Sequence, residues 1–333
     1  METLDLYVSI IIPVYNAEDT LDYCFESLKN QTYPYLQLIF INDASTDQSQ
    51  IKLINFKNSF SSDSSVEVKI IDHSENRGVA SARNTGLKAA TGQFIYFVDA
   101  DDRIENNAIH FLVDVAEKDH ADIVGFDWYL TFNQNERRMY QPAYNSPSEA
   151  LELMLKGRMR WNLWIFFIRR NLFMNNSISF VDGKNLGEDL LIMFKLFLKA
   201  DKVIAINQAF YHYGQSNSNS VSKIYSEKQL DEIKFHVEEV NKLIINSRFR
   251  NQLEQFTHSL KLNAKLPLLI SDKLENYEKW QQMFPSSNQY IRENNGFDFK
   301  SKLIQTMAVK KQYWFLRLYY YFVIKFVYGV IFK

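Results

Sequence analysis

The chain has 333 residues, of which 46% are hydrophobic and 23% charged, and its formal net charge is −1. This length and composition predict one large α/β domain with an appendage, and they exclude a disordered chain. The single cysteine, Cys24, excludes an intrachain disulfide, so we expect a reducing compartment and a core position for its thiol. No nucleic-acid partner is expected. Glu2 and Asp5 stand where a secretion signal would carry basic residues, so no such signal is expected either.

Short β-branched runs alternate with amphipathic stretches along the first half of the chain. We expect strands at 7–14, 36–42, 66–72, 93–98 and 121–126. We expect helices at 17–30, from about 47, at 78–90 and at 104–119. This alternation predicts a mostly parallel sheet covered by helices on both faces. In such sheets, ligands bind at the carboxyl ends of the strands.

Polar side chains follow several of the predicted strands. Tyr15 and Asn16 follow the first, Asp43 follows the second, and Asp99 follows the fourth. The segment "PVYNAEDT" after the first strand has neither the G-x-G-x-x-G of dinucleotide-binding proteins nor the Gly-rich, Lys-ending loop of P-loop enzymes. Since the whole chain has ten glycines, we expect another group to neutralise any bound phosphates.

The segment "DADD" (99–102) places three carboxylates within four positions. In an extended chain, Asp99 and Asp101 point the same way while Ala100 points aside, so both carboxylates can face one Mg²⁺ or Mn²⁺ ion. A bound cation would remove the repulsion between them. The alternative is that one aspartate caps the following helix and the others are solvated turn residues.

The segment "NLGEDLLIMFKLFLKA" (185–200) has an apolar helical face that places Glu188 and Asp189 in the first turn. Transfer of a group to a hydroxyl needs a base, and either carboxylate is a candidate. The alternative is that both acids only complement the helix dipole.

From about residue 226 the chain shows long helical patterns without an evident catalytic motif. Residues 300–333 contain seven Lys or Arg and no acid. The apolar run from Tyr313 to Phe332 is nearly long enough to span a bilayer, but Arg317 and Lys325 interrupt it, at about 2.5–3.5 kcal/mol for a charge at the membrane centre. We therefore expect 310–333 to form one basic, aromatic-rich helix lying on a membrane surface. A helix packed within the protein and a true membrane span are the alternatives.

Three blocks of the sequence resemble the family 2 glycosyltransferases. They are "VSIIIPVYNAEDTLDYCFESLKNQTYPYLQLIFINDASTD", "ENRGVASARNTGLKAATGQFIYFVDADD" and "GEDLLIMFKL". The resemblance covers roughly 7–222 and implies the A-type glycosyltransferase fold, a Rossmann-like, mostly parallel sheet flanked by helices. It further implies that Pro13, Tyr15 and Asn16 border the nucleotide, with Tyr15 near the base, and that Asp43 accepts a hydrogen bond from uracil.

The resemblance also assigns the acidic residues. It implies that Asp101 is the principal metal ligand and that Asp99 approaches the ribose and the metal. It also implies that Ala100 belongs to the nucleotide-sugar site and that Arg83 lies near the donor. Arg83 has a surface salt bridge as its alternative. The aspartate of the family's E-D motif is the catalytic base, which implies this role for Asp189, with Glu188 holding the acceptor or orienting the base.

The segment "FYHYGQSNSNSVS" (210–222) resembles a family loop that closes over the donor. Ser220 and Ser222 match its Ser-x-Ser, whereas Gly214 stands where an arginine is common. His212 is a candidate for a phosphate or metal contact, although a lone histidine is more often structural.

These observations predict a metal-dependent, inverting glycosyltransferase that uses a UDP-sugar and a glycan or lipid-linked acceptor in surface polysaccharide synthesis. We expect a catalytic domain at 1–225 and a helical region at 226–333, in a cytoplasmic protein bound peripherally to the inner membrane. A non-catalytic sugar-nucleotide-binding protein remains the main alternative. A sugar nucleotidyltransferase is disfavoured because "PVYNAED" lacks basic, glycine-rich phosphate contacts.

Overall fold

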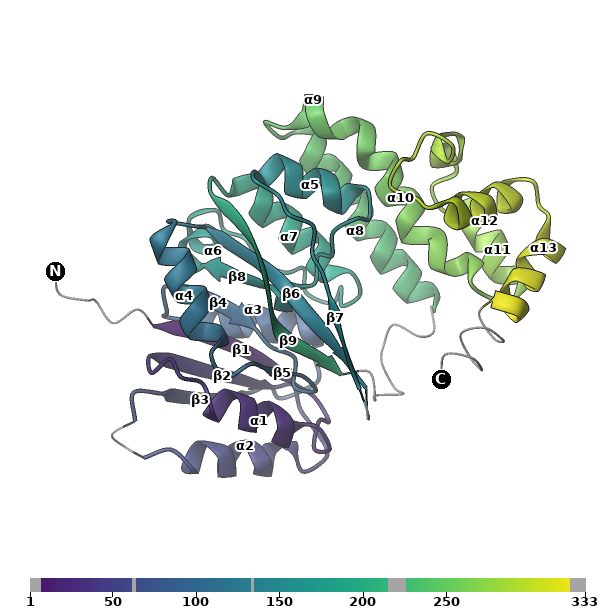
Figure 1. The fold of residues 1–333 in the computed structure, drawn as a ribbon. Coiled ribbons are helices and arrows are strands. Elements are labelled where there is room, and N and C mark those ends of the chain that lie inside the picture. Colours follow the sequence, from purple (N-terminus) through teal and green to yellow (C-terminus); the bar gives the residue numbers. More distant parts are fainter. Residues whose placement is uncertain (1–6, 62–63, 133–134, 215–225, 324–333) are drawn as a thin grey trace. The chain divides into compact units, whose positions relative to one another are not determined.

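A computed structural model describes residues 7–61, 64–132, 135–214 and 226–323. The chain divides into two compact units (Figure 1). One comprises Met1–Glu149 and Trp161–Glu232, and the other comprises Ala150–Arg160 and Ile233–Lys333.

Within the described residues, nine strands of the first unit form one sheet in the order β3-β2-β1-β4-β8-β6-β9-β5, with β7 paired to β6. The strands are β1 (Val8–Val14), β2 (Leu36–Asn42), β3 (Glu67–Asp72), β4 (Phe94–Phe97), β5 (Arg103–Ile104), β6 (Ile123–Thr131), β7 (Glu136–Met139), β8 (Phe166–Arg169) and β9 (Val203–Gly214). β1 pairs in parallel with β2 and β4, and β2 pairs in parallel with β3. The predicted mostly parallel sheet is confirmed.

The short strand β8 was not predicted from the sequence. It pairs antiparallel with both β4 and β6, so it lies between two strands that share a direction. β5 and β7 also run against their neighbours, β9 and β6. β6 and β9 run parallel to each other, and β9 brings residues after 203 back to the edge where β4 ends.

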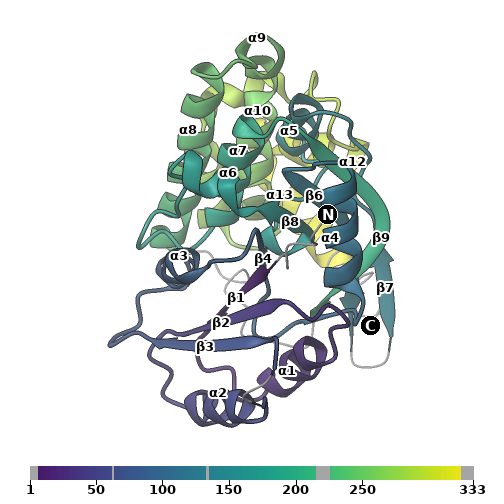
Figure 2. The same ribbon diagram turned by 90° about the vertical axis from the view of Figure 1, so that its left-hand side faces the viewer.

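Helices cover both faces of the β1–β3 region: α1 (Leu21–Lys29) and α2 (Ser49–Asn58) lie on one face and α3 (Val79–Ala89) on the other (Figure 2). On the first face, the rings of Phe25, Phe40 and Phe56 pack with centroids 4.2–5.6 Å apart. On the second, a Cβ at Gly86 would come within 2.4 Å of Ile11. The absence of a side chain at Gly86 therefore lets α3 lie close against β1, which places the middle of α3 near the sheet edge.

The remaining helices of three turns or more include α4 (Ala108–Lys118), α7 (Glu188–Lys199) and α8 (Glu227–Ile245). Shorter helices are α5 (Pro147–Leu155), α6 (Arg170–Asn175) and α9 (Arg250–Leu253). The second unit also contains α10 (Thr257–Lys265), α11 (Leu274–Gln282), α12 (Phe299–Val309) and α13 (Tyr313–Tyr319).

Lys265 is fully buried in this second unit. Its Nζ donates to the carbonyl oxygen of Met283 at 2.8 Å and to Asn288 Oδ1 at 2.5 Å. Burial lowers the pKa of Lys265 to about 7. The ammonium group binds carbonyls just after α11, where a helix C-terminus favours a cation.

The expectation that Lys310 and Arg317 share one helix is wrong. α12 ends at Val309 and α13 begins at Tyr313, with Lys311 at a φ of 55°. The Lys311 N–H donates to the Ala308 carbonyl and the Gln312 N–H donates to the Met307 carbonyl, which is the Schellman arrangement that ends a helix. Lys325 lies outside the described residues. In the part of the chain that the structure describes, no helix is both long and apolar enough to cross a bilayer.

Candidate functional site

Arg83, on α3, contacts three carboxylates at the carboxyl edge of the sheet. Its Nη1 donates to Glu188 Oε1 and to Asp189 Oδ1, each at 2.7 Å, and its Nη2 donates to Asp99 Oδ1 at 3.1 Å. Glu188 and Asp189 are the first residues of α7, and Asp99 lies just after β4. The Arg83 side chain is 4% exposed, so it is not a surface salt bridge. Its guanidinium therefore lies between Asp189, the predicted base, and Asp99, a predicted metal ligand.

Burial and charge act in opposite directions on this cluster. Burial alone lowers the pKa of Arg83, but the carboxylates of Asp189, Asp99 and Glu188 hold that pKa above its ordinary value. Burial, followed by the charge of Asp189, raises the pKa of Glu188 to about 8. Burial also raises the pKa of Asp189, while Arg83 opposes this rise. A carboxylate with a raised pKa accepts a proton more readily near neutral pH, which suits a general base.

Asp189 is held on both of its oxygens. Oδ1 accepts from Arg83, and Oδ2 accepts from the main-chain N–H of Leu163 at 3.2 Å. Sequence reasoning missed Leu163, because its contribution comes from the backbone of a segment 26 residues away and leaves no mark on residue type.

Asp99 and Asp101 lie in the turn after β4, where the N–H of Asp102 donates to the Asp99 carbonyl at 3.1 Å. Asp101 is exposed, the Asp99 side chain is 30% exposed, and Ala100 is buried, with its carbonyl accepting from Thr20 Oγ1. Among the residues that the structure describes, no three His, Cys, Asp or Glu side chains are grouped to hold a metal ion. Two carboxylates facing solvent nevertheless suit Mg²⁺ or Mn²⁺, because such ions commonly combine one or two carboxylates with substrate phosphates.

Asp102, the third acid of "DADD", is buried and has a structural role. Its Oδ2 accepts from the Tyr211 hydroxyl at 2.6 Å, and its Oδ1 accepts from the Gly214 N–H at 2.8 Å. The Tyr211 hydroxyl in turn accepts from the Asp99 N–H at 3.1 Å. Asp102 and Tyr211 thereby fasten β9 to the turn that carries Asp99 and Asp101. Sequence reasoning missed Tyr211, which is 109 residues from Asp102.

Asp43 is buried at the end of β2, and three hydrogen bonds reach its carboxylate. His73 Nδ1 lies 2.6 Å from Oδ1, the Arg77 N–H donates to Oδ1 at 3.0 Å, and the Gly78 N–H donates to Oδ2 at 2.7 Å. A carboxylate offers about four acceptor positions, so the described residues leave room for one more N–H, such as that of a ligand. His73, whose Nε2 lies 2.8 Å from Thr85 Oγ1, was missed from the sequence.

The residues after β1 lie close to those after β2. The Tyr15 side chain is 51% exposed, so one face of its ring can stack on a base. Asn16 has a φ of 48°, and its Oδ1 accepts from the Thr46 N–H at 2.8 Å. Pro13 lies in β1 opposite Ile41. The structure thus brings Tyr15 and Asp43 to the same edge of adjacent strands.

His212 is 3% exposed and lies between two carboxylates. Its Nε2 is 2.7 Å from Glu105 Oε1, its Nδ1 is 2.9 Å from Glu136 Oε1, and its ring stacks on Tyr129. With both ring nitrogens engaged, this geometry favours the structural alternative over a phosphate or metal contact. Ser220 and Ser222 lie outside the described residues.

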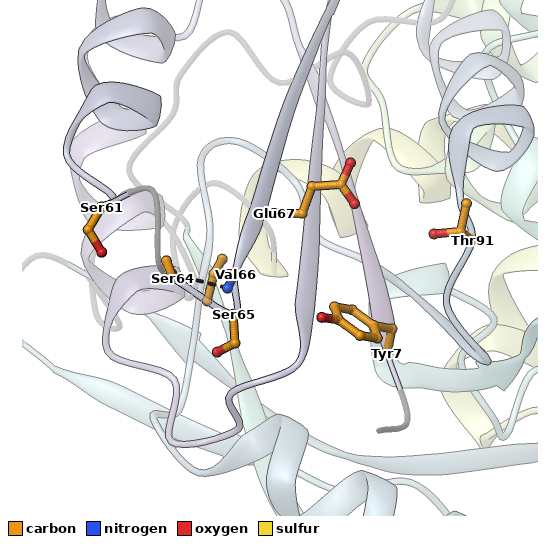
Figure 3. A pocket seen from close by; sticks show the side chains of 7 residues that line it. All are labelled: Tyr7, Ser61, Ser64, Ser65, Val66, Glu67 and Thr91. Atoms are coloured by element: carbon orange, nitrogen blue, oxygen red, sulfur yellow. Dashed lines mark hydrogen bonds between the residues drawn. The ribbon is translucent and has the colours of Figure 1, made fainter. Parts of the chain in front are cut away.

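A pocket elsewhere in the first unit lies at the opposite edge of the sheet (Figure 3). Its lining comprises Tyr7, Ser61, Ser64, Ser65, Val66, Glu67 and Thr91. Tyr7 and Val66 precede β1 and β3, so this pocket lies at the amino ends of the strands. It contains none of the predicted site residues.

Residues 9–188 match the family model described as glycosyl transferase family 2. The chain is also 32% identical over 234 residues to "Uncharacterized glycosyltransferase EpsJ" of Bacillus subtilis (strain 168), a match that covers 68% of this chain and 65% of EpsJ. The chain therefore spans just under two thirds of that relative's length.

Two solved structures share the fold. One is S. aureus TarS 1-349 in complex with UDP-GlcNAc, with a TM-score of 0.71 and 21% identity over 95% of this chain and 91% of TarS. The other is the mannosyltransferase PcManGT from Pyrobaculum calidifontis in complex with GDP-Man and Mn²⁺, with a TM-score of 0.55 and 14% identity over 97% of this chain and 89% of that one. At these identities, the likeness shows the fold.

Proposed function

Because the chain belongs to glycosyl transferase family 2, we propose that it is a metal-dependent, inverting glycosyltransferase that transfers a sugar from a UDP-sugar to a glycan or lipid-linked acceptor. The observation that carries this proposal is the Arg83 cluster, which brings the Glu188–Asp189 pair next to Asp99 at the sheet edge. A binding protein without activity would not need a buried, twice-bonded carboxylate at this edge.

In the proposed reaction, Asp189 takes the proton from the acceptor hydroxyl as its oxygen bonds to the anomeric carbon. The bond from that carbon to the diphosphate oxygen breaks, and UDP leaves with the electron pair. A single displacement of this kind inverts the anomeric centre. Glu188, which shares Arg83 Nη1 with Asp189, orients the base or holds the acceptor.

The donor is proposed to lie along the ends of β1, β2 and β4. Tyr15 stacks on uracil, and Asp43 accepts from a ring N–H with its remaining acceptor position. Asp101 and Asp99 would hold a divalent cation, which supplies positive charge to the diphosphate when bound. The complex of TarS with UDP-GlcNAc supports a uridine nucleotide, and the Mn²⁺ in the PcManGT complex supports the cation.

A screen of sugar nucleotides tests the donor and the metal together. We expect UDP-sugars with Mn²⁺ to raise the melting temperature of the protein, because a ligand at one hundred times its Kd adds about 2.7 kcal/mol. The variant Asp101→Asn should lose this protection while keeping its own melting temperature, because Asp101 is exposed. GDP-sugars serve as the control for base recognition. Equal protection of the variant and the parent would contradict the metal role of Asp101.

The second unit presents an apolar helical face that suits a membrane surface. Trp314, Leu318 and Phe322 are spaced four residues apart and are 62%, 59% and 65% exposed. Arg317 and Lys311 are exposed close by in sequence, in a tail without acidic residues. Aromatic and basic side chains together favour the interface of an anionic bilayer. We therefore propose a peripheral position at the cytoplasmic face of the inner membrane, next to lipid-linked acceptors.

Replacing Trp314, Leu318 and Phe322 by Ser should weaken binding to phosphatidylglycerol vesicles at least about tenfold. The three apolar side chains together should contribute at least about 1.4 kcal/mol of binding free energy, which corresponds to a factor of ten. These side chains point outward, whereas Leu316 is buried, so the fold should persist. The matched control replaces Tyr23, Ile51 and Ile54, which are exposed on α1 and α2, and should not change binding. Vesicle co-sedimentation measures both, and equal binding of the two triple variants would refute the membrane role.

A further inference from the structure

Glu232, on α8, binds the turn that leads into the helix of the catalytic pair. Glu232 is 3% exposed, and its Oε2 accepts from the N–H groups of both Asn185 and Leu186, each at 3.0 Å. Hydrogen bonds to a carboxylate are stronger than bonds between neutral groups. Glu232 lies beyond residues 9–188, the part that matches the family model, and in the region where no catalytic motif is evident.

The turn held by Glu232 leads directly into α7. Gly187, the residue before Glu188, has a φ of 86°, and among the described residues no side chain caps the N-terminus of α7. The direction of the helix start therefore depends on contacts of the residues just before it. Two N–H groups bound by one buried carboxylate oxygen fix the backbone of Asn185 and Leu186, two to four residues from Glu188 and Asp189.

The same turn also contacts the nucleotide edge of the site. Asn185 Oδ1 accepts from the Ala80 N–H at 3.2 Å, at the start of α3. A Cβ at Gly78 would lie 2.2 Å from Asn185 Nδ2, so the Asn185 amide packs directly against the Gly78 backbone. Gly78 in turn donates its N–H to Asp43 Oδ2. A continuous set of contacts thus runs from Glu232 through Asn185 to the start of α3, the helix that carries Arg83.

We propose that Glu232 is a positioning residue for Asp189: its carboxylate sets the 185–187 turn so that the base faces the donor. This inference rests on the proposed function. It implies that the catalytic machinery extends past residue 225 and that the first turns of α8 belong to the active domain. Consistent with this, Glu232 belongs to the first compact unit, which ends at that residue.

The test compares Glu232→Ala, Glu232→Gln and the control Asp231→Asn, whose side chain is exposed on the same helix. UDP release is measured with the UDP-sugar that most stabilises the parent protein, and UDP affinity is measured with Mn²⁺ by calorimetry. We expect E232A to lower kcat about tenfold or more. UDP affinity should stay within about threefold, because Asp43 keeps its contacts with His73 and the Arg77 N–H even if the Gly78 contact loosens, and Tyr15 follows β1. E232Q retains an oxygen acceptor and should restore most of the rate, and D231N should match the parent.

Hydrogen–deuterium exchange of peptides covering 183–190 provides a readout independent of activity, and it should speed up in E232A but not in D231N. A parental rate in E232A, or a loss of UDP affinity in proportion to the rate, would overturn the inference. Asp189→Asn separates the two proposals. If D189N is inactive while E232A is fully active, only the inference fails. If D189N has the parental rate, the proposed base is wrong and the inference falls with it.

Discussion

Asp189→Asn is expected to lower the rate of sugar transfer about a thousandfold, because a carboxamide cannot take the proton of the acceptor hydroxyl. The substitution preserves shape, and an amide oxygen can still accept from Arg83. UDP binding with Mn²⁺ should stay within about twofold, since Asp189 accepts from Arg83 and Leu163, neither of which is proposed to bind uracil. UDP release in the presence of acceptor measures the rate, and calorimetry measures binding.

The control for this substitution is Asp114→Asn on α4. The Asp114 side chain is 70% exposed and pairs with His110, one helical turn earlier, so the variant should behave as the parent. A D189N protein with unchanged transfer would remove Asp189 from the mechanism. A D189N protein that loses UDP affinity as strongly as its rate would instead assign Asp189 to donor binding.

The sequence was sufficient for the parallel part of the sheet because those strands are buried on both faces. β1 and β2 are runs of almost wholly buried residues, which is the pattern that periodicity detects best. β8 was not predicted because it has only four residues. These residues pair with strands about 40 and 70 positions away, and no turn motif next to them in sequence indicates that pairing. The helix expected at 17–30 begins at Leu21, after a turn in which the N–H groups of Ala17 and Glu18 donate to Ser49 and Asp47, contacts that residue type alone does not indicate.

The candidate site likewise has a part that the sequence predicts and a part that it does not. Asp43, Asp99 and Asp101 follow strands, so the rule that ligands bind at the carboxyl ends of parallel strands is enough to bring them to one edge. The contacts of Asp102 with Tyr211 and of Glu232 with the 185–186 turn join elements far apart in sequence. For Glu232 a signal did exist. It lies four residues before the buried His236 and eight before the buried Val240, so an acid occupies the buried stripe of α8.

Arg83→Met is expected to lower the free energy of unfolding by about 3–5 kcal/mol near pH 7, because it leaves buried carboxylates without their cation. The difference in stability between variant and parent should grow as the pH rises toward and above about 8, the pKa of Glu188 in the parent. Burial already raises the pKa of Glu188 to about 8 and the pKa of Asp189 above its ordinary value. Both acids therefore bind protons more tightly in the folded protein than in the unfolded chain, and for Glu188 this difference persists up to about pH 8. Removing the cation raises these pKa values further, so the variant loses more stability than the parent as the acids ionise.

Urea denaturation at pH 5, 7 and 9 measures this difference in stability. Lys52→Met is the control, because Lys52 pairs with Asp22 at 2.5 Å on the surface, where such pairs contribute about 0–1 kcal/mol. A deficit that does not change with pH would mean that lost packing, such as the contact of Arg83 with the Phe180 ring, causes the destabilisation.

Adding Glu188→Gln to Arg83→Met distinguishes charge from packing directly. If unpaired carboxylates cause the loss, neutralising one of them should return part of the stability at pH 8, although the guanidinium is still missing. If the loss reflects the cavity left by Arg83, the second substitution should add its own cost instead. Recovery of stability in the double variant would mean that Arg83 offsets the repulsion between neighbouring carboxylates. Such neighbouring carboxylates are what a catalytic base beside a metal site requires.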